Sequence, residues 1–135
     1  MSNITQVVNS DKNMKTLKKG IHFSDLDQLL SSTGPFTFFA PSDLAFEKQG
    51  NDFMDNLLTS ANKTALTDLM HSHIVPGMYS FQELKDGDKL TTVNGKELLV
   101  EVKNGNIKVD GTEIAARSQR ISNGVIHTMD QVFLK

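Results

Sequence analysis

Two histidines stand one residue apart in the segment MHSHIVPG, residues 70–77. Imidazole nitrogens are common zinc ligands, and residues i and i+2 of an extended strand point to the same side, so this spacing suits a shared metal ion. The residues before them have a helical pattern, however, and on a helix the two rings diverge. Only an approach of His22 or His127 in the fold would add a third imidazole. We therefore expect no metal site, and predict a buried, hydrogen-bonded His73 beside an exposed His71.

Two further polar side chains are interpreted, with His73, as a structural polar core: Asp43 and His127. A buried imidazole loses free energy unless it is hydrogen-bonded, so we expect His73 to bond Asp43 or the backbone at the start of the helix containing it. His127 lies inside the strand-like segment GVIHTMD, and its charge changes near neutral pH, which suits ligand binding or proton transfer. We favour a structural role for His127 in fixing the last strand, and the same role for Asp130.

The sequence APSD, residues 40–43, places a serine and an acid side by side. A serine hydrolase needs a strained Gly-x-Ser-x-Gly elbow and an oxyanion hole, and this chain has no such motif. Ser42 and Asp43 follow a strand and precede a helix, so they are better explained as caps. The segment DGDK, residues 86–89, lacks the remaining ligands of a calcium loop and predicts a turn. We expect no catalytic residue, no cofactor and no enzymatic activity.

The composition limits the partners. The chain has 135 residues, no cysteine and a net charge of −2 from 14 basic and 16 acidic residues. This balance does not provide the concentrated basic face that nucleic-acid binding needs. No apolar run approaches the roughly 20 residues of a membrane span. The cluster Lys12, Lys15, Lys18 and Lys19 suits acidic polysaccharide or anionic headgroups. It equally suits a solvated helix face, which we favour.

The pattern of elements indicates one α+β domain over residues 1–135. Helices are expected over 14–21, 23–34, 42–48 and 60–72, with Ser24 as an N-cap, and a short aromatic strand over 36–40. Ser80 and Glu83 have capping-box spacing. From residue 89 onward, polar and apolar residues alternate, and the pairs Asn94-Gly95, Asn104-Gly105 and Asp110-Gly111 suit tight hairpin turns. The second half should be an antiparallel meander.

Two long segments resemble the two signatures of the fasciclin domain. GPFTFFAPSDLAF, residues 34–46, is similar to the first, and SNGVIHTMDQVFLK, residues 122–135, is similar to the second. The stretch HIVPGMYSFQELKDGDKLTTVNGKELLV between them resembles the central part of the family. The resemblance implies a wedge-shaped β-sandwich with several helices packed on one side. It also implies secreted, periplasmic or surface-anchored proteins that act in cell adhesion, without catalysis as a rule.

The resemblance also bears on the partners. Family members usually carry a tyrosine-histidine pair before Val-Pro-Gly, and their integrin binding draws on that tyrosine. Here Ser72 stands at the tyrosine position, and Ser118-Gln119 stands where animal members have an aspartate-isoleucine pair. Integrin binding is therefore not predicted. The expected partner is a protein or polysaccharide of the cell surface or matrix.

The expected interaction surface lies around Met78, Tyr79 and Phe81, where apolar side chains follow Pro76-Gly77 in a connection. In the competing interpretation these side chains only close the wedge. The alternative function is a carrier of a small hydrophobic ligand. Some fasciclin-domain proteins bind carotenoids, and the six methionines and eight phenylalanines are numerous enough to line a cleft between helices and sheet.

Overall fold

The computed structural model describes residues 3–12, 14–24, 26–31, 34–48 and 63–129. In these residues the helices are α1 (Ile4–Ser10), α2 (Lys15–Phe23), α3 (Asp27–Ser31), α4 (Asp43–Glu47), α6 (Lys63–His71) and the 3-10 helix η2 (Phe81–Glu83). The strands are β1 (Phe36–Pro41), β2 (Ile74–Pro76), β3 (Lys89–Thr91), β4 (Glu97–Lys103), β5 (Asn106–Val109), β6 (Thr112–Ile121) and β7 (Gly124–Met129). None of the described helices has the length and apolar character that crossing a bilayer requires.

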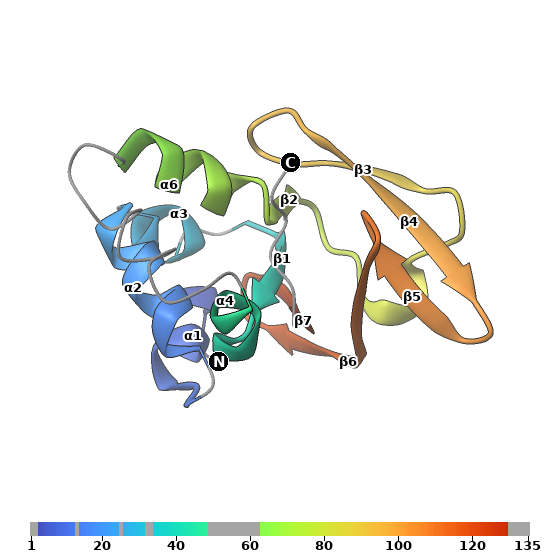
Figure 1. Cartoon of the computed structure of the whole chain (residues 1–135), viewed down its shortest axis with the longest axis horizontal. Coiled ribbons are helices and arrows are strands. Elements are labelled where there is room, and N and C mark those ends of the chain that lie inside the picture. The colour runs from blue at the N-terminus through green and yellow to red at the C-terminus, as the bar shows by residue number, and fades with distance from the viewer. Residues whose placement is uncertain (1–2, 13, 25, 32–33, 49–62, 130–135) are drawn as a thin grey trace.

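The described strands follow one another in the order β2-β1-β7-β6-β5-β4-β3. The pair β1–β7 is parallel, from Phe36 opposite Gly124 to Pro41 opposite Met129, and the other pairs are antiparallel. Figure 1 shows α1, α2, α3, α4 and α6 on one side of β1, with the strands β3, β4 and β5 on the opposite side. The first strand of the chain is therefore joined directly to the last described one.

The strand pair β1–β7 is buried on both faces. Successive side chains of a strand point to opposite sides, so neighbouring residues of these strands join two different clusters. Phe38 and Ile126 pack with the helices, and we call this cluster the helix-side core. Phe39 and Met129 pack with side chains of β3, β4 and β5, and we call this second cluster the sandwich core. The predicted α+β class, a β-sandwich with helices on one side, is confirmed.

Local signals predicted the turns and one helix start correctly. Asn104-Gly105 joins β4 to β5 and Asp110-Gly111 joins β5 to β6, and all four residues have positive φ, between 51° and 82°. Before η2, the backbone N–H and the hydroxyl of Ser80 both donate to Oε1 of Glu83, at 3.1 and 2.7 Å. The capping box predicted there is present.

The expectation that Ser24 starts a helix is wrong. Ser24 is the C-cap of α2, and its hydroxyl donates to the carbonyl oxygen of Gly20 at 2.7 Å. The helix α2 extends to Phe23 and α3 begins only at Asp27, so the serine bonds backward to the preceding turn. A serine hydroxyl can also bond the carbonyl group four residues earlier instead of an amide ahead of it.

The variant Gly124→Ala tests how closely the backbones of β1 and β7 approach each other. A Cβ at Gly124 would lie 1.9 Å from the carbonyl oxygen of Phe36, which is backbone and cannot move aside alone. The variant is expected to lower the free energy of unfolding by roughly 2–4 kcal/mol, measured by urea denaturation. Gly87→Ala is the control, because a Cβ there meets nothing within 4 Å. The control should lose only about 1 kcal/mol of unfolding free energy, because an alanine at this positive φ is strained. Equal losses in the two variants would contradict the steric explanation.

Candidate functional site

The connection between β2 and η2 carries the three side chains predicted to form an interaction surface. Met78, Tyr79 and Phe81 are each partly exposed. The Tyr79 ring lies against Gly77, where a Cβ would be 3.0 Å from the ring atom Cε2. Gly77 also has a φ of +107°, which L side chains rarely adopt. Close packing and backbone conformation therefore both require glycine at this point. We call residues 77–81 the site loop.

Thr37 of β1 holds the site loop through its hydroxyl group. The Thr37 hydroxyl donates to the carbonyl oxygen of Gly77 and accepts from the amide of Tyr79, each at 2.9 Å. The amide of Gly77 donates to the carbonyl oxygen of Pro35, also at 2.9 Å. Thr37 is fully buried. One buried hydroxyl thus satisfies two loop backbone groups that would otherwise be costly to leave unpaired.

His127 of β7 fixes the next backbone group of the loop. Its Nε2 lies 2.6 Å from the carbonyl oxygen of Tyr79. A carbonyl oxygen only accepts, so Nε2 carries the proton and the neutral ring leaves Nδ1 unprotonated. The ring is fully buried and stacks on Phe39, its partner in the β1–β7 register, at a centroid distance of 5.2 Å. Burial lowers the pKa of His127, and the bond to Tyr79 opposes that effect only in part. The ring is therefore held neutral.

His127 Nδ1 is buried and has no hydrogen-bond partner in the part of the chain that the structure describes. Protonating it would place a positive charge there without an acceptor, which reinforces the neutral state. The ring thus works as a donor at one nitrogen and as an apolar surface toward Phe39. This arrangement suits bracing of the loop better than proton transfer.

His73 is buried as expected, and the backbone of its own helix supplies one partner of its ring. Its Nδ1 lies 2.8 Å from the carbonyl oxygen of Leu69, in the last turn of α6. Asp43 accepts a 2.8 Å hydrogen bond from the amide of Thr16 and so anchors the start of α2. His73 lies two residues after the end of α6, so its ring can bond the carbonyl group four residues earlier. Burial lowers the pKa of His73 to about 4; the Leu69 bond opposes this, and the charge of Lys96 adds to it.

The four histidines are not brought to one point. His71 ends α6 and is partly exposed, while His22 lies on the outer side of α2, with Nε2 3.2 Å from Oδ1 of Asn9. Among the residues that the structure describes, no three histidine or acidic side chains are grouped so that they could hold a metal ion. Asp130, expected to have a structural role, lies outside the described residues.

The remaining acid and serine candidates occupy backbone-supporting positions. Asp86 accepts from the amide of Val102 at 2.9 Å, and Asp88 accepts from the amide of Lys85 at 3.0 Å, so DGDK forms the predicted turn. Ser42 is the N-cap residue of α4, although its side chain makes no capping bond.

Ser72, at the tyrosine position of the family pattern, is buried. Its hydroxyl donates to the carbonyl oxygen of Asp68 at 3.0 Å and accepts from Nδ2 of Asn94 at 3.1 Å. This residue connects α6 to the turn between β3 and β4. It therefore offers no exposed side chain to a partner.

Sequence reasoning missed Thr37 and two exposed leucines. Thr37 was recognisable as the one hydroxyl inside an otherwise apolar strand, because a buried hydroxyl must find partners. Leu44 on α4 and Leu99 on β4 are 52% and 42% exposed. The exposure of Leu99 follows from the alternation in β4, because Leu99 is in phase with Glu97 and Glu101.

The low pKa of His73 predicts a pH-dependent stability. Between pH 6.5 and about 4 the unfolded chain binds a proton on His73 that the folded protein does not bind, so stability falls as pH falls. From pH 7 to 4.5, wild type should lose roughly 2 kcal/mol more unfolding free energy than His73→Gln. Urea denaturation at both pH values measures the difference. His71→Gln, the control, should keep the wild-type slope. An unchanged slope in His73→Gln would mean that the buried ring does not control it.

Thr37→Val tests the attachment of the site loop. Valine keeps the shape but removes the hydroxyl, which leaves the Gly77 carbonyl and the Tyr79 amide without their partner. The expected loss is about 1–3 kcal/mol, with faster amide hydrogen exchange at Tyr79 than at strand residues. Thr37→Ser, which keeps the hydroxyl, should retain slow exchange at Tyr79. Slow exchange in both variants would show that the loop is held by other contacts.

Comparison with known proteins places this arrangement in a family. A sequence model of the fasciclin domain matches residues 12–135. Protein sll1483 of Synechocystis sp. is 34% identical over 131 residues, which are 97% of this chain and 72% of that protein. Transforming growth factor-beta-induced protein ig-h3 of Sus scrofa is 29% identical over 134 residues, but the match covers only 19% of it.

The fold has a counterpart among solved structures. The FAS1 domain pair from the insect cell adhesion molecule Fasciclin I aligns with a TM-score of 0.86 at 20% identity, covering 99% of this chain and 51% of that one. This likeness supports the fold, and the match over residues 12–135 supports the family. The chain belongs to the fasciclin domain family.

Proposed function

We propose that this chain is a non-catalytic interaction module that binds a protein or polysaccharide partner through the site loop. The observation that carries the proposal is the fixation of the loop by Thr37 and His127 while Met78, Tyr79 and Phe81 remain partly exposed. A loop already held in one conformation pays less ordering entropy on binding than a mobile one. Partly exposed apolar side chains next to it supply contact area.

The competing packing role applies unequally to the three side chains. Tyr79 and Phe81 pack partly against the sandwich core, whereas Met78 is not among the side chains packed there. Beside them, Arg120 of β6 and Glu83 of η2 approach to 3.6 Å and add exposed charges. The surface therefore combines a small apolar centre with a polar edge, as protein interfaces commonly do.

The structural roles of the polar candidates support a non-catalytic function. Asp43 anchors a helix, His73 bonds its own helix and His127 bonds the site loop. The relatedness to a fold found in an insect cell adhesion molecule points the same way. We place the protein outside the cytoplasm, in the periplasm, at the cell surface or in the extracellular space. Nucleic acid and integrins are not proposed as partners.

Among the described residues, core packing explains the side chains that were expected to line a hydrophobic cleft. The phenylalanines and methionines that were candidates to line a cleft include Phe36, Phe38, Phe46, Met14 and Met70, and these fill the helix-side core with the other buried side chains. Core packing accounts for them without a ligand.

Met78→Asp tests the binding role with little risk to the fold. Cells of the species that makes the protein are allowed to attach to the immobilised purified chain, and attached cells are counted. The variant should lower attachment at least about fivefold, because a charge placed in an apolar contact costs more than about 1 kcal/mol. Leu99→Asp places the same charge on another exposed apolar residue and should leave attachment unchanged.

Two results would reject the loop as the binding surface. One is equal attachment to the Met78 and Leu99 variants. The other concerns Phe81→Ala, analysed by attachment and thermal melting together. Suppose that Phe81→Ala lowers the melting temperature without reducing attachment, and that Met78→Asp does not reduce attachment either. These side chains would then have only the packing role.

A further inference from the structure

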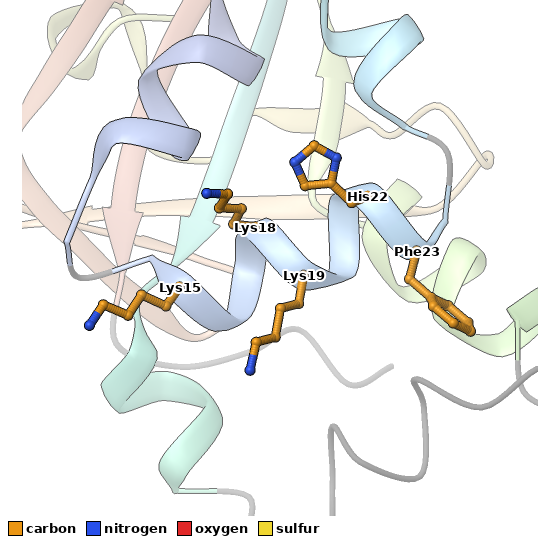
Figure 2. A pocket seen from close by; sticks show the side chains of 5 residues that line it. All are labelled: Lys15, Lys18, Lys19, His22 and Phe23. Carbon is orange, nitrogen blue, oxygen red and sulfur yellow. The ribbon is translucent and has the colours of Figure 1, made fainter.

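The outer side of α2 borders a hollow of about 800 Å³. Leu17, Gly20 and Ile21 on the inner side of this helix are buried against the core. Figure 2 shows Lys15, Lys19 and Phe23 in one row along the helix, at i, i+4 and i+8, with Lys18 and His22 in the adjoining row. We call the hollow the lysine groove; its described lining residues are Lys15, Lys18, Lys19, His22 and Phe23.

The lysine groove has a strong local excess of positive charge. The sequence of α2, KTLKKGIHF, contains no acidic residue, although the whole chain carries a net charge of −2. No acidic side chain is among the described lining residues, and none of the three lysines forms an ion pair with a described residue. The nearby Asp43 accepts from the amide of Thr16. The hollow is therefore bordered by three lysines (Figure 2) with no acid among its described lining, and its surface is mostly apolar. Lysines without opposing acids give a positive local potential.

We propose that the lysine groove binds an acidic polysaccharide, a chain of sugars bearing carboxylate or sulfate groups. Lysine ammonium groups on flexible stems are point charges without the fixed fork of arginine, so they suit repeated anionic groups in more than one register. The partly exposed ring of Phe23 adds an apolar surface on which a sugar ring can pack. The proposal rests on the proposed function, because an extracellular or periplasmic module meets such polymers.

Two other anionic partners, a bilayer surface and double-stranded DNA, fit this groove less well. A bilayer surface is broad and flat, and peripheral helices bind it with a protruding apolar face, whereas the apolar face of α2 is buried and its lysines border a hollow. Double-stranded DNA is usually read by a basic domain with arginine contacts to bases, and α2 has no arginine in a chain of net negative charge.

Titration calorimetry with polygalacturonate and with dextran sulfate tests the proposal, using neutral dextran as the uncharged probe. Wild type should bind both acidic polymers, more weakly at about 200 mM salt than at about 50 mM salt. It should not bind neutral dextran. The triple variant Lys15→Gln, Lys18→Gln, Lys19→Gln should lose at least about tenfold in affinity, since three ammonium groups are removed from one groove.

A matched triple variant removes the same charge elsewhere. Lys89→Gln, Lys103→Gln and Lys108→Gln change exposed lysines of β3, β4 and β5, and affinity should fall less than about twofold. Equal losses in the two triple variants would overturn the groove as the site. The absence of binding by wild type would overturn it as well. So would tighter binding to phosphatidylserine vesicles or to a DNA duplex than to either polysaccharide.

The results separate this proposal from the loop proposal. Met78→Asp should bind the acidic polysaccharides as wild type does, because Met78 lies outside the groove. If wild type attaches cells through the loop yet ignores both polymers, only the groove proposal fails. If the polymers bind in the groove while Met78→Asp leaves cell attachment intact, only the loop proposal fails.

Discussion

The parallel pairing of β1 with β7 is the constraint on which the rest of the structure depends. It joins the helical first part of the chain to its last described strand, and its two faces contribute to both cores. The pairing begins where Gly124 meets the backbone of Phe36, at a distance that no side chain tolerates. Beside it, Asn123 accepts from the amide of Ile4 at 3.0 Å and donates to the carbonyl oxygen of Leu30 at 2.7 Å. One strand junction thus positions the sheet, α1 and the end of α3.

The same strand pair determines the conformation of the site loop. Thr37 and His127 lie on the sandwich side of β1 and β7, the side of Phe39 and Met129. A polar group in such a place adds little net stability, but it specifies which backbone groups must meet it. The hydroxyl and the imidazole together bond Gly77 and Tyr79. The burial of both side chains makes these bonds hard to exchange for water, which is why a connection without regular structure has a defined shape.

Short-range signals in the sequence predicted the turns and the capping box, whereas the contact of Thr37 with residues 40 and 42 positions later was missed. Asn104-Gly105 and the Ser80–Glu83 box act within four residues, so their outcome could be predicted from composition and spacing. Ser24 was assigned to the wrong helix because its preference for N-caps outweighed its ability to bond a carbonyl group of the preceding turn. The burial of His73 followed from its apolar neighbours, but its bond to Leu69 was not predicted, because the sequence does not show whether a ring turns back to its own helix or toward another. The family pattern supplied the overall β-sandwich, which periodicity alone would not have distinguished from other α+β folds.

The two proposed surfaces lie on different sides of the β1–β7 pair. The helix α2 packs into the helix-side core, whereas Tyr79 and Phe81 of the site loop pack against the sandwich core, and Figure 1 shows α2 and the strands β3 to β5 on opposite sides of β1. A ligand in the lysine groove therefore leaves the loop accessible. Both surfaces belong to one domain. A polysaccharide bound in the lysine groove therefore raises the effective concentration, at the site loop, of any protein attached to that polysaccharide. Two modest affinities of the proposed surfaces would thus combine on one scaffold without any change in either surface.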